Sequence, residues 1–177
     1  MNFRAFLPLL LLATVSLAAC EGSYYPLSEP ADSVIDESFT GTWLASSPDE
    51  ETSLLSIIPF NNHEYLGMAW TPGEEGDALP VAIFTTSVEG ALFANVRCLA
   101  CDNDDGIYFL FKYERTSPDR MIVYSVEGDV YDELQGLNST DAVRDFVKRY
   151  MSTDAFFDDG YGVYNRTEDE TWPWISN

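Results

Sequence analysis

The sequence predicts an all-β domain: an antiparallel up-and-down barrel, or a strongly curved sheet, with one C-terminal α-helix packed on it. Three observations support this fold class. Short runs of β-branched and aromatic residues follow one another from Phe39 onwards, turn residues separate them, and no long helical crossover intervenes before residue 138. Because parallel neighbours need such crossovers, the short connections favour antiparallel pairing.

The apolar runs predict seven strands in succession. Every connection between them contains Gly, Pro, Asn or Asp, which supply the backbone angles or the local side-chain hydrogen bonds of turns. In the sixth run, alternation puts Ile107, Phe109, Phe111 and Tyr113 on one face, and we expect that face to point inward. The predicted strands are 39–46, 52–59, 63–71, 80–88, 91–99, 106–115 and 120–127.

A single helix is predicted over 139–151. Ser139 and Thr140 provide capping oxygens at its start, and apolar residues then recur at helical spacing on one face. After the helix, 155–164 is expected to be a strand or extended segment that closes a β domain spanning 37–166. The tail, 167–177, is acidic and then aromatic, with Trp172 and Trp174. The apolar stripe of the helix consists of Val143, Phe146, Val147 and Tyr150.

The first 36 residues have the features of a secretory leader followed by a tether. Residues 1–19 combine a positive Arg4 with an apolar stretch too short to cross a bilayer, which is typical of a signal peptide. The run Leu-Ala-Ala-Cys that ends at Cys20 resembles a bacterial lipobox. The resemblance implies cleavage before Cys20 and acyl chains on it, hence a membrane anchor. Glu21 is not the Asp that signals inner-membrane retention, so we expect the outer membrane. Residues 20–36 carry two prolines and no apolar period, and are expected to be a flexible tether.

The chain is strongly acidic, with 30 acidic and 9 basic residues and a net charge of −21. Such a field repels phosphates, so nucleic acid is excluded as a partner. Because the acids are spread along the whole chain, solubility explains them better than one cation-binding block does.

Gly41 and Trp43 form a Gly-x-Trp at the start of the first predicted strand. This motif is similar to the start of calycins, the superfamily that contains the lipocalins. The resemblance implies an antiparallel barrel plugged at one end by Trp43, with a late arginine packed over it, and Arg166 is the candidate. Together with the lipobox, the Phe93–Val96 segment and the late helix, the pattern resembles lipocalin-like bacterial lipoproteins. That resemblance implies a fold and an envelope location, but no particular activity.

Cys98 and Cys101 form a Cys-x-x-Cys pair. A redox enzyme would place the first thiol at a helix N-terminus, whereas here a β run precedes the pair and acidic residues, which raise a thiol pKa, follow it. With His63 as the one histidine, a closed zinc site cannot be built from these thiols. We therefore expect a structural disulfide, stabilising by about 2 kcal/mol because its loop is short.

No catalytic, cofactor or metal site is predicted. Asp102, Asp104 and Asp105 offer oxygens for calcium but lack the spacing of an EF-hand, and the acidic turn at 158–160 is interpreted in the same way. Gly-x-Ser-x-Gly is absent, and a lone histidine in a turn, as His63 is expected to be, is more often solvated than catalytic.

Aromatic residues of the predicted strands have two interpretations. Tyr65, Phe84, Phe109 and Phe111 either line a pocket or fill the barrel with their own side chains. The expected function is a non-enzymatic envelope lipoprotein that binds a small apolar ligand or a protein partner. The alternatives are an accessory subunit of an envelope complex with a filled barrel or, with less support, a hydrolase or redox enzyme.

Overall fold

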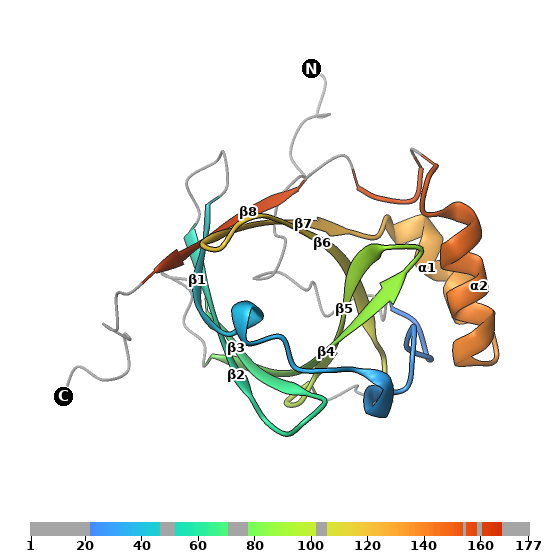
Figure 1. Cartoon of the computed structure of the whole chain (residues 1–177). Coiled ribbons are helices and arrows are strands. Elements are labelled where there is room, and N and C mark those ends of the chain that lie inside the picture. The colour runs from blue at the N-terminus through green and yellow to red at the C-terminus, as the bar shows by residue number, and fades with distance from the viewer. Residues whose placement is uncertain are drawn as a thin grey trace, which may run out of the picture.

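A closed antiparallel barrel of eight strands forms the body of the protein, as the fold class predicted (Figure 1). The computed structural model describes residues 22–46, 52–70, 78–101, 106–153, 155–158 and 161–167. Each strand pairs with the next in sequence, and the last pairs with the first, so the alternative of an open curved sheet does not apply. The strands are β1 Gly41–Ser46, β2 Thr52–Pro59, β3 Tyr65–Trp70, β4 Leu79–Val88, β5 Ala91–Cys98, β6 Phe109–Ser117, β7 Arg120–Ser125 and β8 Gly162–Thr167.

The predicted strands coincide with β1 to β7 to within a few residues at each end. Phe39 was expected in the first strand but belongs to a short 3-10 helix, η2 (Glu37–Phe39), which leads into β1. The closing segment was expected at 155–164, whereas β8 occupies Gly162–Thr167 and pairs with both β1 and β7. Residues 155–157 instead lie beside the helices, where Phe156 is 1% exposed.

The inner face of the barrel carries one hydrophobic core. It contains Phe109, Phe111 and Tyr113, so the inward face predicted for β6 is confirmed for these three residues. Ile107 was expected on the same face, but it precedes β6 and does not belong to this core. Trp43, Tyr65 and Tyr164 are the largest of its fully enclosed members. The other buried members are Phe39, Leu55, Ile57, Ala69, Val81, Ile83, Ala94, Val96, Met121 and Val123.

A second core lies outside the barrel, under two helices (Figure 1). The predicted helix is α2, Thr140–Tyr150, and the Ser139 side chain caps it by accepting a hydrogen bond from the Ala142 amide. A second helix, α1 (Gly128–Gln135), was not predicted. Leu110 of β6 is 0% exposed on this outer face, because the helices cover it. Among the described residues, no helix is long and apolar enough to cross a membrane.

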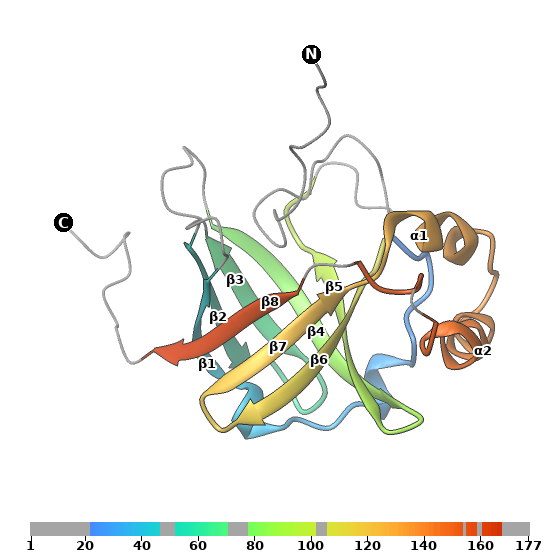
Figure 2. The same ribbon diagram turned by 90° about the horizontal axis from the view of Figure 1, so that it is seen from above.

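The segment expected to be a flexible tether is packed on the barrel over residues 22–36, and that prediction is wrong for this part. Ser23 exchanges backbone hydrogen bonds of 2.8 Å with Tyr108, just before β6. Leu27 is 0% exposed, and its amide donates to the Asn95 side chain at 2.8 Å. The segment runs along the outside of the barrel, through the 3-10 helix η1 (Pro30–Asp32), and reaches η2 at the opposite end (Figure 2). We call residues 22–36 the strap.

Candidate functional site

One end of the barrel is closed by η2, and we call it the plugged end. It is the end at which β1 begins and at which the β2–β3, β4–β5 and β6–β7 turns lie. Phe39, 4% exposed, packs inside the barrel with its ring centroid 5.3 Å from that of Tyr65 and 5.1 Å from that of Tyr113. An aromatic side chain donated by the segment before β1 therefore fills this opening.

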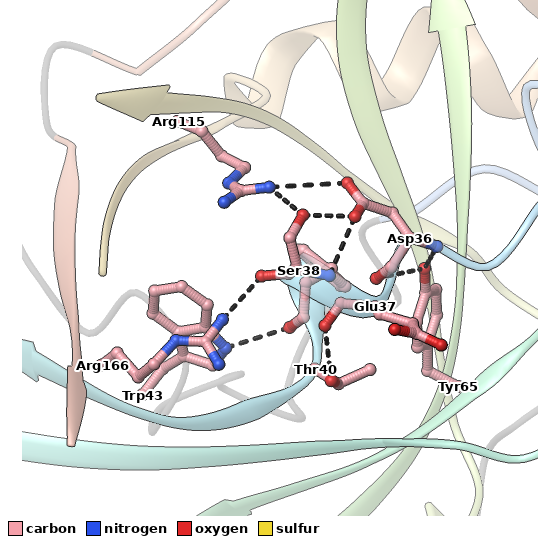
Figure 3. Close-up of polar contacts among 9 residues, drawn as sticks. Asp36, Glu37, Ser38, Thr40, Trp43, Tyr65, Arg115 and Arg166 are labelled. Atoms are coloured by element: carbon pink, nitrogen blue, oxygen red, sulfur yellow. Dashed lines mark hydrogen bonds and ion pairs between the residues drawn. The ribbon is translucent and has the colours of Figure 1, made fainter. Parts of the chain in front are cut away.

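Trp43 and Arg166 meet beneath η2 (Figure 3). The Arg166 guanidinium carbon lies 4.7 Å from the centre of the Trp43 ring, within range of a cation–π interaction. Arg166 Nη2 donates to the Ser38 carbonyl at 2.7 Å, and Trp43 Nε1 donates to the Phe39 carbonyl at 3.0 Å. Both side chains thus hold the backbone of η2 in place, and β1–β8 pairing sets Trp43 directly opposite Arg166.

Gly41 leaves room for this arginine. Its φ of +122° is a conformation that L side chains rarely adopt, and an added Cβ would lie 2.9 Å from Arg166 Nη1. The Gly-x-Trp motif and Arg166 therefore have the structural roles that were predicted for them.

The chain matches no protein-family model, no curated protein and no solved structure. The arginine stacked on the tryptophan is established by the geometry of this molecule, and its relation to calycins stays a prediction.

A polar cluster ties the strap to the barrel wall at the plugged end (Figure 3). The Asp36 carboxylate accepts hydrogen bonds from the Ser38 amide and hydroxyl, and lies 3.6 Å from Nη1 of Arg115, which also donates to the Ser38 hydroxyl. The Asp36 amide donates to the Tyr65 hydroxyl at 2.6 Å. The hydrogen bond from the Ser38 hydroxyl is the main reason why the pKa of Asp36 lies below its usual value of 3.8.

The chemistry of this cluster is that of a clamp. A carboxylate with a lowered pKa is a poor general base near neutral pH. The Tyr65 pKa is raised, chiefly by burial, so its hydroxyl stays protonated and serves as both donor and acceptor for the Asp36 backbone. Sequence reasoning missed this cluster, because Arg115 is distant in the chain from Asp36 and Ser38 and the three residues share no motif.

The opposite end, which we call the far end, is lined differently. Ala45, Leu79, Phe109 and Phe111 point inward there and are only partly buried. Alternation along each strand places further small residues inward near the same end, where the plugged end has aromatic rings and an arginine. These small inward residues are Ser53, Ala69, Ser125 and Gly162.

The four residues considered for a pocket do not share one face. Tyr65 lies inside, at the plugged end, and Phe109 and Phe111 lie inside, at the far end. Phe84 is on the outer face, because it pairs with Asn95 and alternates with the inward Val81 and Ile83; its ring meets that of Tyr108 at 6.1 Å. The assignment of Phe84 to an internal pocket is therefore wrong, since its ring lies on the outer face of the barrel beside that of Tyr108.

The cysteine pair is bonded as expected. Cys98 ends β5, and its Cα lies 5.8 Å from that of Cys101 in the disulfide. His63 is exposed in the β2–β3 turn, and its Nδ1 lies 2.7 Å from the Ser33 carbonyl. Of the other residues weighed above, Cys20, Asp102, Asp104, Asp105, Trp172 and Trp174 lie outside the described residues.

Proposed function

We propose that this protein is a lipid-anchored envelope lipoprotein, without enzymatic activity, whose barrel holds a small apolar ligand at the far end. The observation that carries the proposal is the unequal lining of the barrel. One end is filled by Phe39, Trp43 and Tyr65, whereas partly buried apolar side chains and small residues face inward at the other.

The sizes of the inward residues support an apolar ligand. The inward residues Ser53 and Ser125 are smaller than the aromatic residues that fill the plugged end, and Phe109 and Phe111 offer a ligand apolar surface. Burial of such surface is favourable by roughly 25 cal/mol per Å². The leader and Cys20 support the anchor and the envelope location, because the order of charge, apolar stretch, small residues and cysteine is that of a lipobox.

The test is titration of the purified protein with N-phenyl-1-naphthylamine, a neutral probe whose fluorescence rises in apolar surroundings. Ser53→Phe puts a ring on the inner face at the far end, and Ser56→Phe is the matched control on the outer face of the same strand, β2. We expect saturable binding that Ser53→Phe abolishes and Ser56→Phe leaves unchanged. Absence of binding, or equal loss in both variants, would refute a ligand site inside the barrel. Mass spectrometry of the protein from its host tests acylation of Cys20.

A second candidate, an accessory subunit that binds a protein, is favoured by exposed apolar side chains at the plugged end. Val34 is 78% exposed and Phe60 is 70% exposed, and the contact of His63 with the Ser33 carbonyl joins the segments that carry them. A partner retained in native mass spectrometry, and lost on Phe60→Ser while probe binding persists, would favour this function over the first.

A further inference from the structure

The strap leaves almost no free chain between the proposed anchor and the barrel. Cys20 precedes Gly22 by two residues, which span at most about 7 Å when extended. Gly22 is buried, and a Cβ added to it would lie 2.1 Å from Cγ2 of Ile107 and 3.2 Å from the Tyr108 carbonyl. The next residue, Ser23, pairs with Tyr108 through both backbone hydrogen bonds. An acylated Cys20 would therefore be held close to one fixed point on the barrel wall.

That point lies at the far end. Tyr108 immediately precedes β6, which begins where β5 ends, because the two strands are antiparallel neighbours. Ala45, Leu79 and Phe109 occupy the same end, since β1 finishes there while β4 and β6 start there.

Exposed apolar side chains accompany this attachment point. Tyr24 is 48% exposed and Tyr25 is 37% exposed, directly after Ser23, and Leu99 is 47% exposed directly after the last residue of β5. Tyrosine rings with a polar tip suit the headgroup region of a bilayer.

Building on the proposed lipid anchor and ligand site, we propose that the far end of the barrel faces the bilayer, with Tyr24, Tyr25 and Leu99 at the headgroups. The plugged end then points away from the membrane. An apolar ligand can pass between the lipid and the barrel without crossing bulk water, and the short connection at Glu21 enforces this orientation.

Charge defines the kind of lipid surface. The strands β1 to β6 have three sequence segments between their far ends, 47–51, 71–77 and 102–105, which together contain nine Asp and Glu residues. Anionic headgroups would be repelled over about 10 Å at moderate ionic strength. The partner is therefore a zwitterionic surface such as phosphatidylcholine or phosphatidylethanolamine.

The two ends of the barrel are far enough apart to be distinguished. β5 has 8 residues, and at about 3.3 Å per residue and a tilt of about 40° its ends are separated by roughly 20 Å along the barrel axis. A probe at Tyr24 and one at Asn62, exposed in the β2–β3 turn at the plugged end, therefore report on different depths.

The experiment uses the full acylated protein in phosphatidylcholine vesicles that carry a nitroxide-labelled lipid. Tyr24→Cys and Asn62→Cys each provide one thiol for a fluorophore, because Cys98 and Cys101 are bonded to each other. We expect the lipid-borne quencher to remove most of the fluorescence of the label at 24 and none at 62. A flexible Gly/Ser insertion of about 20 residues after Glu21 has a root-mean-square span of roughly 25 Å, and should abolish the quenching at 24 while acylation is retained.

Equal quenching at both positions, stronger quenching at 62, or quenching at 24 that survives the insertion would overturn this orientation. Acylated protein that binds the naphthylamine probe would then leave the proposed function intact. Mature protein without acyl chains on Cys20 would overturn the orientation and the proposed anchor together. Vesicles of phosphatidylglycerol should reduce the quenching at 24, and an increase there would contradict the choice of a zwitterionic surface.

Discussion

Asn95→Ala is expected to release the strap from the barrel without opening the barrel itself. Asn95 is 0% exposed. Its Oδ1 accepts the Leu27 amide at 2.8 Å, and its Nδ2 donates to the Thr86 hydroxyl at 3.0 Å and to the Phe84 carbonyl at 3.3 Å. A buried amide side chain with three partners joins the strap to β4 and β5.

The magnitude follows from what the truncation leaves behind. Each lost hydrogen bond contributes about 1 kcal/mol, and a buried donor without an acceptor, here the Leu27 amide, costs roughly 1–3 kcal/mol. Partial relaxation of the strap reduces this sum, so we expect the free energy of unfolding to decrease by about 3 kcal/mol. For a chain of this size, that loss corresponds to a decrease in Tm of roughly 6–12 °C.

The assay combines thermal unfolding with amide hydrogen exchange of residues 22–36. Asn165→Ala, on the exposed outer side of β8, is the matched control, and we expect it to change stability by less than about 0.5 kcal/mol. In the parent protein the Leu27 amide should be protected, and Asn95→Ala should remove that protection while β6 keeps its own. Rapid exchange of the Leu27 amide in the parent protein, or equal effects of the two substitutions, would refute the packed strap.

Three further predictions concern Arg166 at the plugged end, the buried phenol of Tyr113 and the N-cap of α2. Arg166→Met keeps an apolar side chain but removes the charge over Trp43 and the hydrogen bond to the Ser38 carbonyl. The free energy of unfolding, measured in urea, should therefore decrease by about 2–3 kcal/mol. Burial raises the pKa of Tyr113 from 10.0 to about 12. As the pH rises, this phenol ionises in the unfolded chain before it ionises in the folded protein. Its contribution to the free energy of unfolding is therefore fully present below pH 10 and should be lost between pH 10 and 12, by at most roughly 3 kcal/mol, measured from urea midpoints. Ser139→Ala removes the cap of α2 and should cost about 1 kcal/mol in thermal unfolding.

Matched variants decide these outcomes. Arg120→Met and Ser152→Ala alter exposed positions, and each should have less than half the effect of its counterpart. The decrease in the free energy of unfolding between pH 10 and 12 should be smaller in Tyr113→Phe. An unchanged pH dependence in that variant would contradict the assignment to Tyr113, and a stable Arg166→Met protein would contradict a role for the stacked guanidinium in holding η2.

The spacing of apolar residues in the sequence predicted an element correctly where one face of a strand, or one stripe of a helix, is buried. The alternation of Phe109, Phe111 and Tyr113 predicted the inner face of β6 because a two-residue period has one buried side. It could not predict that the opposite face is buried as well, as Leu110 is, since helices distant in sequence cover it.

The missed elements depend on partners that local patterns do not contain. α1 starts at Gly128, has no side-chain cap, and buries Tyr131 and Leu134 with few other apolar residues. Its position is set by tertiary contacts, among them the hydrogen bond from the Leu110 amide to the Tyr131 hydroxyl at 2.9 Å. The strap likewise looked like a linker, because its order comes from Asn95, which is distant in sequence.

In the candidate site, the Gly-x-Trp motif predicted how the plugged end is closed, but no motif predicted the lining of the far end. Gly41 and Trp43 are close in sequence, and the resemblance supplied Arg166. The small inward residues at the far end come from separate strands, so their common feature becomes visible only once the register is known. Alternation could not have indicated Ser53 and Ala69, because β2 and β3 carry apolar residues on both faces.

The pairing of β1 with β8 makes completion of the barrel depend on a strand that is synthesised after all the other strands of the barrel. Until Gly162–Thr167 has emerged, β1 and β7 both present unpaired backbone groups, which other chains can use to aggregate. Synthesis or export that stops before β8 should therefore yield an insoluble product, even though most of the strands are already present. A late, long-range contact of this kind also slows folding, so this protein should need protection by a chaperone for longer than a helical protein of equal length.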